Sequence, residues 1–293
     1  MRIAVVAHRG KTLGDGLPEL RKRLTAAGID DDLWFEVPKS KQAPKRVRQA
    51  VKAGAERVLV WGGDGMVRRC IGELAGSDVL LGILPAGTAN LLATNLGIPH
   101  DLARALDVAL RGAPRPLDVG TVNGERFAVM AGAGFDGHMI RAADTSAKQR
   151  LGRLAYVVTG ARATREAATR IRVRVDGKSW FSGRASCVLV GNVSTATGGL
   201  VLFDRARPDD GVLDVGIVTA QGSIEWLRVL GRAVRHHAAA SPFVRVTRGA
   251  KVDVRLDRPL PYELDGGDRG STRHLRFGVE PRAINVLVPN GAR

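Results

Sequence analysis

A short glycine-rich turn is the first place in this sequence where residue types and spacing suggest chemistry. Four apolar residues, Val58 to Trp61, run directly into Gly62-Gly63-Asp64-Gly65, and a helical pattern follows at once. Glycines at the carboxyl end of a strand let the backbone turn tightly and bring amide N–H groups close to a ligand. The following helix adds the positive end of its dipole. The turn is therefore a candidate phosphate-binding site.

Two familiar phosphate motifs do not fit this turn. A Walker loop requires Lys-Ser/Thr after its last glycine, whereas Met66-Val67 follow here. A dinucleotide fingerprint requires G-x-G-x-x-G, and the turn supplies only the first pair of glycines. An ordinary tight turn between a strand and a helix is the alternative interpretation.

Asp64 distinguishes this turn from a plain phosphate loop. A carboxylate among amides repels phosphate, unless a divalent cation lies between them or the carboxylate acts as a base toward an incoming hydroxyl. Both options indicate phosphoryl transfer from a magnesium nucleotide. A second polar glycine turn, Gly87-Thr88-Ala89-Asn90, follows another predicted strand. We expect both turns to line one crevice, because α/β sheets bind ligands beyond the carboxyl ends of their strands.

The elements that must position these turns alternate regularly over residues 1–118. Apolar runs and helical periodicity predict strands at 2–8, 33–37, 57–61 and 80–85, and helices at 17–28, 43–54 and 101–112. Gly28, Gly54 and Gly112 stand at the expected helix ends, and Asp101 is placed to cap the last helix. This alternation predicts a doubly wound, parallel-sheet nucleotide-binding domain.

The pattern changes to strands in the second part of the chain. Predicted strands cover 117–122, 126–132, 171–176, 183–191, 212–218, 251–256 and 284–288, with turns such as Asn123-Gly124, Asp176-Gly177 and Asp210-Gly211. Helical segments are expected at roughly 140–168 and 221–238. The predicted fold class is thus α/β plus β, with an α/β domain at 1–118 and a mostly antiparallel β-sandwich domain at 119–280. Residues 281–293 are expected to pack back on the first domain.

Charge indicates the class of partner. The 293 residues carry 45 Lys+Arg against 29 Asp+Glu, a formal net charge of +16. Such a chain is drawn to polyanions, although a solvated arginine-rich surface is the alternative. The segment from Arg141 to Arg174 contains nine basic residues and two acidic ones. It could therefore lie on an anionic membrane or form a solvated helix face. Nucleic acid is not expected, because aromatic residues are only 4% and no recognition motif is present.

Cysteine usage and hydropathy indicate the compartment. Cys70 and Cys187 are far apart and each lies in an apolar context, which is typical of core thiols in a reduced cytosolic protein. The first residues do not predict a signal peptide, and Gly and Pro interrupt the longest apolar stretch before it reaches spanning length. The expected location is cytoplasmic, in peripheral association with the inner face of the membrane.

Taken together, the motifs resemble the diacylglycerol kinase catalytic domain family, which includes bacterial diacylglycerol and other lipid kinases and is related to sphingosine kinases and NAD kinases. The resemblance rests on GGDG at 62–65, GILPAGTANLLATNLGIP at 82–99, GAGFDG at 132–137, VGNVSTATGGLVLFDRARPDDGVLDVGIV at 190–218 and YELDGG at 262–267. It covers nearly the whole chain in order. It implies an NAD kinase/diacylglycerol kinase-like fold and an ATP- and Mg2+-dependent transfer of the γ-phosphate to a hydroxyl of diacylglycerol or a similar membrane lipid.

The resemblance also implies particular site residues. ATP would be held by Ser40, by Gly62, Gly63, Asp64, Gly65, Met66, Val67, Arg68 and Arg69 of the first turn, and by Gly87, Thr88 and Asn90 of the second. A structural Mg2+ would fall on Asp210 with the backbone carbonyls of Arg207 and Val212. Asp265 would act as general base on the lipid hydroxyl or organise its water and Mg2+, and Asp64 is the other catalytic candidate.

This chain departs from the family pattern at two places, the first glycine turn and the segment that begins with Asp265. In the first turn the family usually has Gly-Gly-Asp-Gly-Thr with a following Asn-Glu. This chain keeps the Gly-Gly-Asp-Gly part and has Met66, Arg68 and Arg69 in place of the threonine, asparagine and glutamate. Its Asp-Gly-Glu becomes Asp265-Gly266-Gly267, with Asp268 one residue later as a possible substitute for the glutamate. A catalytically impaired nucleotide- or anion-binding relative and an NAD kinase-like enzyme are therefore the alternatives. The identity of the lipid and the formation of a homodimer stay open.

Overall fold

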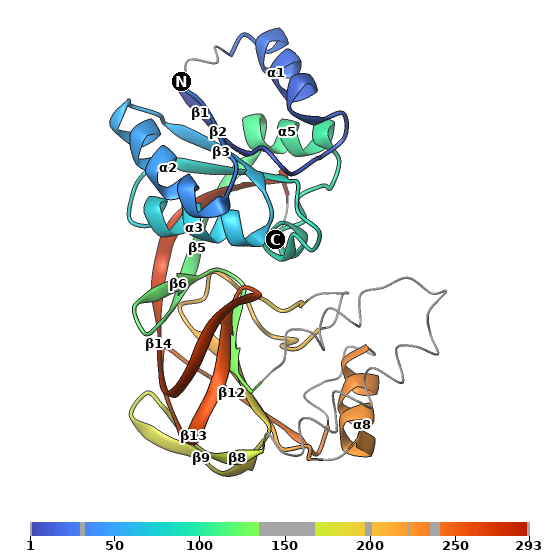
Figure 1. Ribbon diagram of the computed structural model, residues 1–293, viewed down its shortest axis with the longest axis vertical. Helices are drawn as coiled ribbons and strands as arrows, with labels where there is room; N and C mark the ends of the chain where they lie inside the picture. The colour runs from blue at the N-terminus through green and yellow to red at the C-terminus, as the bar shows by residue number, and fades with distance from the viewer. Residues whose placement is uncertain are drawn as a thin grey trace. The chain divides into compact units, whose positions relative to one another are not determined.

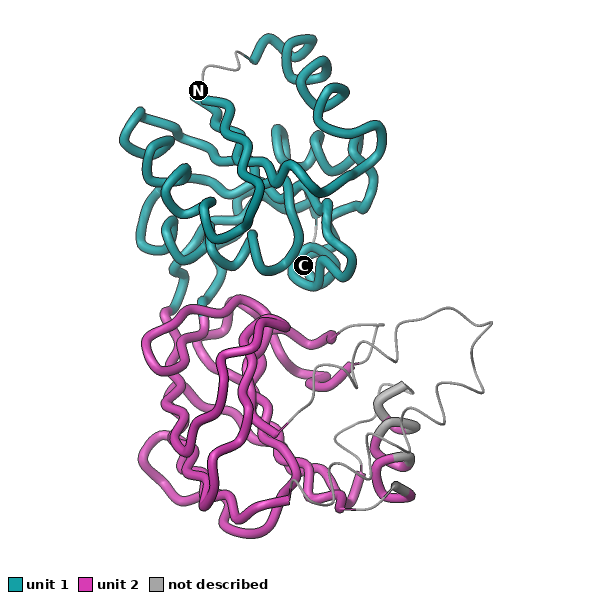
Figure 2. The backbone as a smooth tube through the Cα atoms, in the orientation of Figure 1, with its two compact units in different colours: residues 1–119, 281–293 teal, residues 120–280 magenta. Residues whose placement is uncertain are grey.

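The computed structural model describes residues 2–29, 33–134, 168–196, 201–221, 223–234 and 241–291. The chain forms two compact units, residues 1–119 with 281–293 (unit 1) and residues 120–280 (unit 2), as Figure 2 shows. β5 (Ala113–Val122) and β14 (Gly267–Val288) each run from one unit into the other. Nearly all of the helical segment predicted at 140–168 lies outside the described residues.

Unit 1 is built on a parallel sheet. Its strands are β1 (Ile3–His8), β2 (Trp34–Val37), β3 (Arg57–Gly62), β4 (Leu80–Pro85) and the carboxyl-terminal end of β14, in the order β2-β1-β3-β4-β14. Every pair is parallel. All six residues of β3 are buried, as expected for a strand covered on both faces. The predicted doubly wound sheet is confirmed.

Helices cover both faces of this sheet. α1 (Gly16–Ala26) and α5 (Leu102–Arg111) lie on one face, and α2 (Ala43–Lys52) and α3 (Asp64–Leu74) lie on the other (Figure 1). A 3-10 turn, η1 (Ser40–Gln42), precedes α2, and the short α4 (Leu91–Asn95) follows β4. Asp101 caps α5 as predicted, since its Oδ1 accepts a hydrogen bond of 2.9 Å from the Arg104 amide.

Unit 2 is a β-sandwich of antiparallel strands. Its strands are β6 (Glu125–Phe127), β7 (Met130–Ala133), β8 (Thr169–Val175), β9 (Lys178–Ala185), β10 (Cys187–Gly191), β11 (Leu213–Val218), β12 (Val244–Gly249) and β13 (Lys251–Leu264), with α8 (Ser223–Val234) between β11 and β12. β13 joins two layers, because its first half pairs with β8 and its last residues pair with β7.

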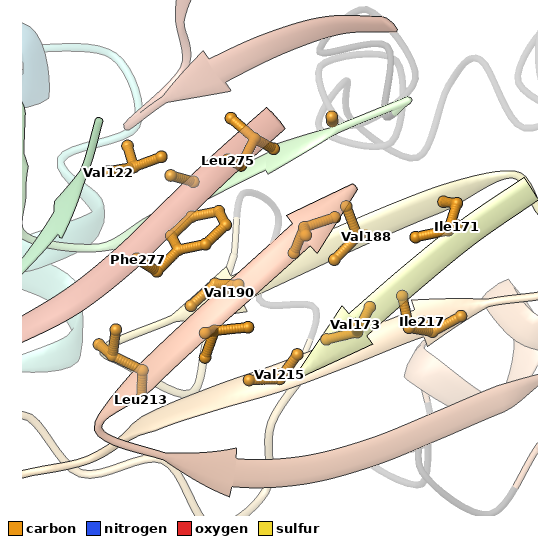
Figure 3. Close-up of a cluster of buried hydrophobic side chains, with 14 of the residues drawn as sticks. Val122, Ile171, Val173, Val188, Val190, Leu213, Val215, Ile217, Leu275 and Phe277 are labelled. Carbon is orange, nitrogen blue, oxygen red and sulfur yellow. The ribbon is translucent and has the colours of Figure 1, made fainter. Parts of the chain in front are cut away.

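The alternation of side chains along the strands builds the core of unit 2. β8 follows the pattern buried-exposed over its whole length, which places Ile171 and Val173 inside and Arg172 and Arg174 outside. Figure 3 shows the buried side chains that β8 shares with β10 and β11, among them Val188, Val190, Val215 and Ile217. Cys187 and, in unit 1, Cys70 are buried free thiols, as predicted. Within the described residues, no helix combines the length and apolar character needed to cross a bilayer.

Three hairpins of unit 2 share one turn chemistry. Asn123-Gly124, Asp176-Gly177 and Asp265-Gly266 each join paired strands by two residues, and all six have positive φ between 45° and 87°. These are features of type I′ turns, which favour Asn-Gly and Asp-Gly. The sequence predicted the first two as turns. The third is the segment to which the family resemblance assigns the catalytic carboxylate.

Candidate active site

The parallel strands of unit 1 bring four turns to one edge of the sheet, among them the two predicted glycine turns. The backbone amide of Arg9, after β1, donates to the carbonyl of Val37 at the end of β2 over 2.9 Å. Trp61 Nε1, at the end of β3, donates to the carbonyl of Lys11 over 3.0 Å. Ser40 begins the 3-10 turn directly after β2. The turn after β1, the Ser40 segment and the two glycine turns therefore share the edge where α/β sheets bind ligands.

The two glycine turns touch through their backbones. β3 and β4 are neighbours in the sheet, and Gly62 is paired with Pro85 in their register. A Cβ added to Gly63 would lie 3.0 Å from the Cα of Gly87, and one added to Gly87 would lie 2.5 Å from Asn90 Oδ1. Only glycine permits such a close approach. The two turns therefore meet at this edge of the sheet, and a ligand-binding crevice between them stays a prediction.

Asn90 folds the second turn. Its Oδ1 accepts a hydrogen bond from the Gly87 amide (2.8 Å), and its Nδ2 donates to the carbonyls of Pro85 (3.1 Å) and Gly87 (2.9 Å). The residue is buried and has a left-handed φ of 48°. Thr88, by contrast, is exposed at the tip of the turn. Asn90 is thus a positioning residue, and Thr88 is the member of this turn that is available to a ligand.

Asp64 is the first residue of α3, and its carboxylate faces the start of α4. Its Oδ1 accepts from the Leu92 amide over 3.4 Å. Burial raises the pKa of the Asp64 carboxyl, and the amides of Leu92, Leu91 and Asn90 oppose this shift. The carboxylate therefore couples the two glycine turns, and a carboxyl with a raised pKa at a ligand-binding edge is a candidate for proton transfer.

The remaining predicted residues of the first turn divide between the core and the surface. The side chains of Met66 and Val67 are 2% and 4% exposed, and a Cβ on Gly62 would lie 2.8 Å from Met66 Sδ. Arg68 is buried as well. Gly65 is exposed, and Gly63 and Arg69 are half-buried. The side chains of Met66 and Val67 thus belong to the core, and the backbone of the turn and the side chain of Arg69 are the parts that solvent reaches.

Asp265, in unit 2, is held by backbone amides. Its Oδ1 accepts from Val129 (2.9 Å) and Met130 (3.0 Å), and its Oδ2 accepts from Ala128 (2.9 Å). A carboxylate offers about four acceptor positions, so most of this capacity is committed to the chain. Asp176, in the equivalent place of another type I′ hairpin, likewise accepts from the amides of Ala250 (3.1 Å) and Lys251 (2.8 Å). The geometry gives Asp265 a structural role, and its catalytic role stays a prediction.

Gly267, which stands where the family has glutamate, lies next to the side chain of Arg269. A Cβ added to Gly267 would lie 3.2 Å from both Arg269 Nη1 and the Leu264 carbonyl. The Arg269 Nε donates to Glu125 over 2.9 Å. Asp268, the sequence-based substitute for the glutamate, accepts from the Gly270 amide over 2.9 Å and is exposed. Arg269 is a feature of this turn that the sequence interpretation did not weigh.

An arginine side chain lies beside the carboxylate to which the family resemblance assigns a structural Mg2+, and the assignment of that ion to Asp210 with the carbonyls of Arg207 and Val212 stays a prediction. The Arg248 guanidinium is hydrogen-bonded to Asp210 and contacts Asp214 at 3.3 Å, and the Val212 amide donates to Asp210 at 3.3 Å. No cluster of three or more His, Cys, Asp or Glu among the described residues is arranged to hold a metal. Burial raises the pKa of Asp214, and Arg248 opposes the shift. The cation beside these carboxylates is thus an arginine.

Arg248 was missed because its role depends on strand register. It lies opposite Asp214 in the antiparallel pair of β11 and β12. Cross-strand neighbours of opposite charge stabilise such a pair. The sequence around residue 248 contains no motif that predicts this contact. Only the pairing of β11 with β12 brings Arg248 close to Asp210 and Asp214.

Comparison with known proteins identifies the family. Residues 7–122 match the diacylglycerol kinase catalytic domain, and residues 129–288 match the YegS C-terminal NAD kinase beta sandwich-like domain. A probable lipid kinase YegS-like of Pseudomonas aeruginosa (strain UCBPP-PA14) is 36% identical over 85% of this chain and 82% of the relative. The diacylglycerol kinase of Bacillus subtilis (strain 168) is 30% identical over 84% of this chain and 82% of the relative.

Solved structures support the same fold. A diacylglycerol kinase from Bacillus anthracis str. Sterne superposes with a TM-score of 0.73 at 18% identity, covering 100% of this chain and 98% of the other. An NAD kinase from Archaeoglobus fulgidus, solved in complex with ATP, gives a TM-score of 0.56 at 13% identity over 99% and 94%. The chain belongs to the family of YegS-like lipid kinases and diacylglycerol kinases, and it is a transferase of the lipid kinase class.

Proposed function

We propose that this protein is an ATP-dependent lipid kinase that transfers the γ-phosphate of ATP to a hydroxyl of diacylglycerol or a similar membrane lipid. The observation that carries the proposal is the backbone contact of Gly63 with Gly87, beside the carboxylate of Asp64. Two amide-rich turns that touch at the edge of a parallel sheet suit a polyphosphate. The family membership and the ATP-bound NAD kinase of similar fold support ATP as the donor.

In the proposed reaction, each part of the site has a defined task. Mg2+ bound with the nucleotide would neutralise charge on its phosphates. The exposed backbone at Gly65 and the exposed Thr88 hold phosphate oxygens, while Asn90 keeps the second turn in shape. The lipid oxygen bonds to the γ-phosphorus, the bond to the bridging oxygen of ADP breaks, and ADP leaves with that electron pair.

The proton of the lipid hydroxyl requires an acceptor. Asp64 suits this task because burial raises the pKa of its carboxyl. Asp265 suits it less well, because three backbone amides use its oxygens. We therefore propose Asp64 as the base and Asp265 as the residue that shapes the hairpin between β13 and β14.

Specific observations favour two alternatives, a catalytically impaired relative and an NAD kinase-like enzyme. Gly267 stands where the family has glutamate, which favours an impaired nucleotide-binding relative. The likeness to an NAD kinase motivates NAD as acceptor, but the Pseudomonas and Bacillus subtilis relatives are named as lipid or diacylglycerol kinases. In the impaired relative, ATP raises the melting temperature and no acceptor is phosphorylated.

Purified protein with γ-labelled ATP and a panel of acceptors tests the proposal. The panel contains diacylglycerol, ceramide, sphingosine, phosphatidylglycerol and NAD, each with Mg2+ and with Mn2+. The proposal expects label in a lipid product and little or none in NAD. ATP binding without any labelled lipid contradicts the kinase and supports the impaired relative, whereas label in NAD alone supports the NAD kinase-like alternative.

A further inference from the structure

A basic groove lies on unit 2, with the core residues Val252 and Phe277 among those that line it. It has a volume of about 540 Å3 and is lined by side chains of β8, β13 and β14 together with Thr121 of β5. Its charged members are Arg174, Lys251, Asp253, Arg255 and Arg276. The volume lies within the usual range for small-molecule sites, which is roughly 300–1,000 Å3. The groove therefore has room for a phosphorylated head group.

Strand register explains why the cations gather here. Asp253 of β13 is paired with Arg174 of β8 on one side and with Arg276 of β14 on the other. Side chains two residues apart on a strand share a face, so Lys251 and Arg255 flank Asp253 along β13. Four cations thus surround one carboxylate, and all four are exposed.

The single carboxylate is already engaged. Asp253 lies 2.6 Å from His274 Nε2 and accepts from Arg255 Nε at 3.3 Å. Arg174 donates to the Gly177 carbonyl at 2.6 Å, which fixes its guanidinium beside the groove. Lys251 and Arg276 form no ion pair with any residue that the structure describes. An anion in the groove would relieve the repulsion among these cations.

The chemistry of the groove suits a phosphate diester at a surface. Guanidinium groups bind phosphate oxygens in a bidentate manner, and the ammonium of Lys251 adds a point charge. The exposed face continues along β8 through Arg172 and Arg170. The aromatic side chain that lines the groove, Phe277, is 4% exposed and offers no platform on which a nucleic-acid base could stack.

We propose that this groove binds the phosphate of anionic phospholipids and docks unit 2 on a membrane surface. The choice of a lipid as the source of the phosphate rests on the proposed function, because a kinase of membrane lipids must work at a bilayer. The face is distinct from the turns of unit 1 that are assigned to ATP. Docking at this face raises the local concentration of the lipid acceptor around the enzyme.

Sedimentation with vesicles tests the groove without ATP or diacylglycerol. The full chain is mixed with vesicles of phosphatidylcholine alone or of phosphatidylcholine with phosphatidylglycerol. The test variant is Lys251→Ala/Arg276→Ala, whose two side chains are exposed. The control is Lys22→Ala/Lys52→Ala in unit 1, which removes the same charge from exposed positions on α1 and α2. Circular dichroism and melting temperatures establish that both variants fold.

The wild-type protein should bind the vesicles with phosphatidylglycerol and should bind pure phosphatidylcholine weakly. The groove variant should lose about 30-fold in partitioning, from roughly 1 kcal/mol per cation at an anionic surface, while the control stays near the wild type. An equal loss in both variants, or no loss in either, would overturn the proposal. Binding to a short RNA is measured in parallel by gel shift, and a groove variant that loses this binding but still binds the vesicles like the wild type would also overturn the proposal. Because no turnover is measured, a kinase without activity could still pass this test.

Discussion

Gly63 and Gly87 belong to turns that follow two neighbouring strands, and they approach so closely that neither position has room for a side chain. This contact joins the two sets of amides that we assign to the phosphates of ATP. Asp64 adds a second link, since its carboxylate accepts from the Leu92 amide after the second turn. The site is therefore a single backbone-built unit, and it should respond to changes at this junction as a unit.

Adding a methyl group at this junction should disrupt both stability and ATP binding. In Gly87→Ala the new Cβ meets the Cα of Gly63 and lies 2.5 Å from Asn90 Oδ1, so the turns must separate. We expect a loss of about 1–3 kcal/mol in the free energy of unfolding, typical of overpacking, and loss of the ATP-induced rise in melting temperature. The matched control is Gly72→Ala in α3, where a Cβ meets nothing within 4 Å. A Gly87→Ala protein that binds ATP like the wild type would contradict the close contact.

The charge of Asp64 should give a characteristic pH dependence of stability. Burial raises the pKa of this carboxyl above its ordinary value of 3.8, so the folded protein holds the proton more tightly than the unfolded chain does. Stability from this group is present below the unfolded pKa and is lost as pH rises through the folded pKa. The asparagine of Asp64→Asn does not titrate, so this pH-dependent contribution is absent from the variant. The melting temperature of Asp64→Asn relative to wild type should therefore increase with pH across the acid range and then level off.

Asp101→Asn is the control of opposite sign. The hydrogen bond from the Arg104 amide and the contact with its guanidinium lower the pKa of Asp101. The stability that this carboxylate contributes is present above its unfolded pKa and is lost as pH falls through the folded pKa. Relative to wild type, Asp101→Asn should become less stable as pH rises. The same trend in both variants would show that the environment of Asp64 is not as described.

The hydrogen bonds of Asp265 predict a structural cost for its replacement. In Asp265→Asn the side chain keeps one acceptor oxygen, while the wild-type carboxylate serves three amides with two. The variant should lose about 1.5–3 kcal/mol in the free energy of unfolding, because a hydrogen bond to a charged group is lost. In Asp176→Asn the loss should be smaller, since both amides bond to the same oxygen, Oδ1. Urea denaturation measures both. Full stability of Asp265→Asn together with loss of turnover would instead assign the carboxylate to catalysis.

Arg248 should make the loop before β11 independent of a divalent metal. The wild-type melting temperature is expected to be the same with EDTA as with excess Mg2+ in the absence of nucleotide. Arg248→Met leaves Asp210 and Asp214 without their shared cation and should lower the melting temperature. Mg2+ or Ca2+ should restore part of the loss in this variant only. A wild-type protein that EDTA destabilises would show that the carboxylates hold a metal despite Arg248.

Local sequence patterns were sufficient to predict the fold because its elements are regular. The buried run of β3, the cap at Asp101 and the Asn-Gly and Asp-Gly turns each depend on neighbours in the chain. Contacts set by register were not predictable in this way. The pairing of Arg248 with Asp214 depends on how β11 lies against β12, and the clamp of Asp265 on residues 128–130 joins segments far apart in the sequence.

The candidate site shows the same limit at the level of single residues. The glycine turns and Asp64 could be selected because glycines suit a phosphate loop, whereas a carboxylate repels phosphate unless it has a separate task. Met66 and Asn90 belong to the same motifs, yet the direction of each side chain depends on packing. Met66 covers Gly62 in the core, and Asn90 bonds to the backbone of its own turn. A motif therefore locates the turn and does not assign every residue within it.

The most direct test of the central claim is the transfer of label from γ-labelled ATP to diacylglycerol in mixed micelles, with NAD present as a competing acceptor. The wild-type protein and Gly72→Ala should produce labelled phosphatidic acid and leave NAD unlabelled. Asp64→Asn should still show an ATP-induced rise in melting temperature but should lose at least about 100-fold in turnover, as expected when a general base is removed. Label in NAD, or unchanged turnover in Asp64→Asn, would contradict a lipid kinase that uses Asp64.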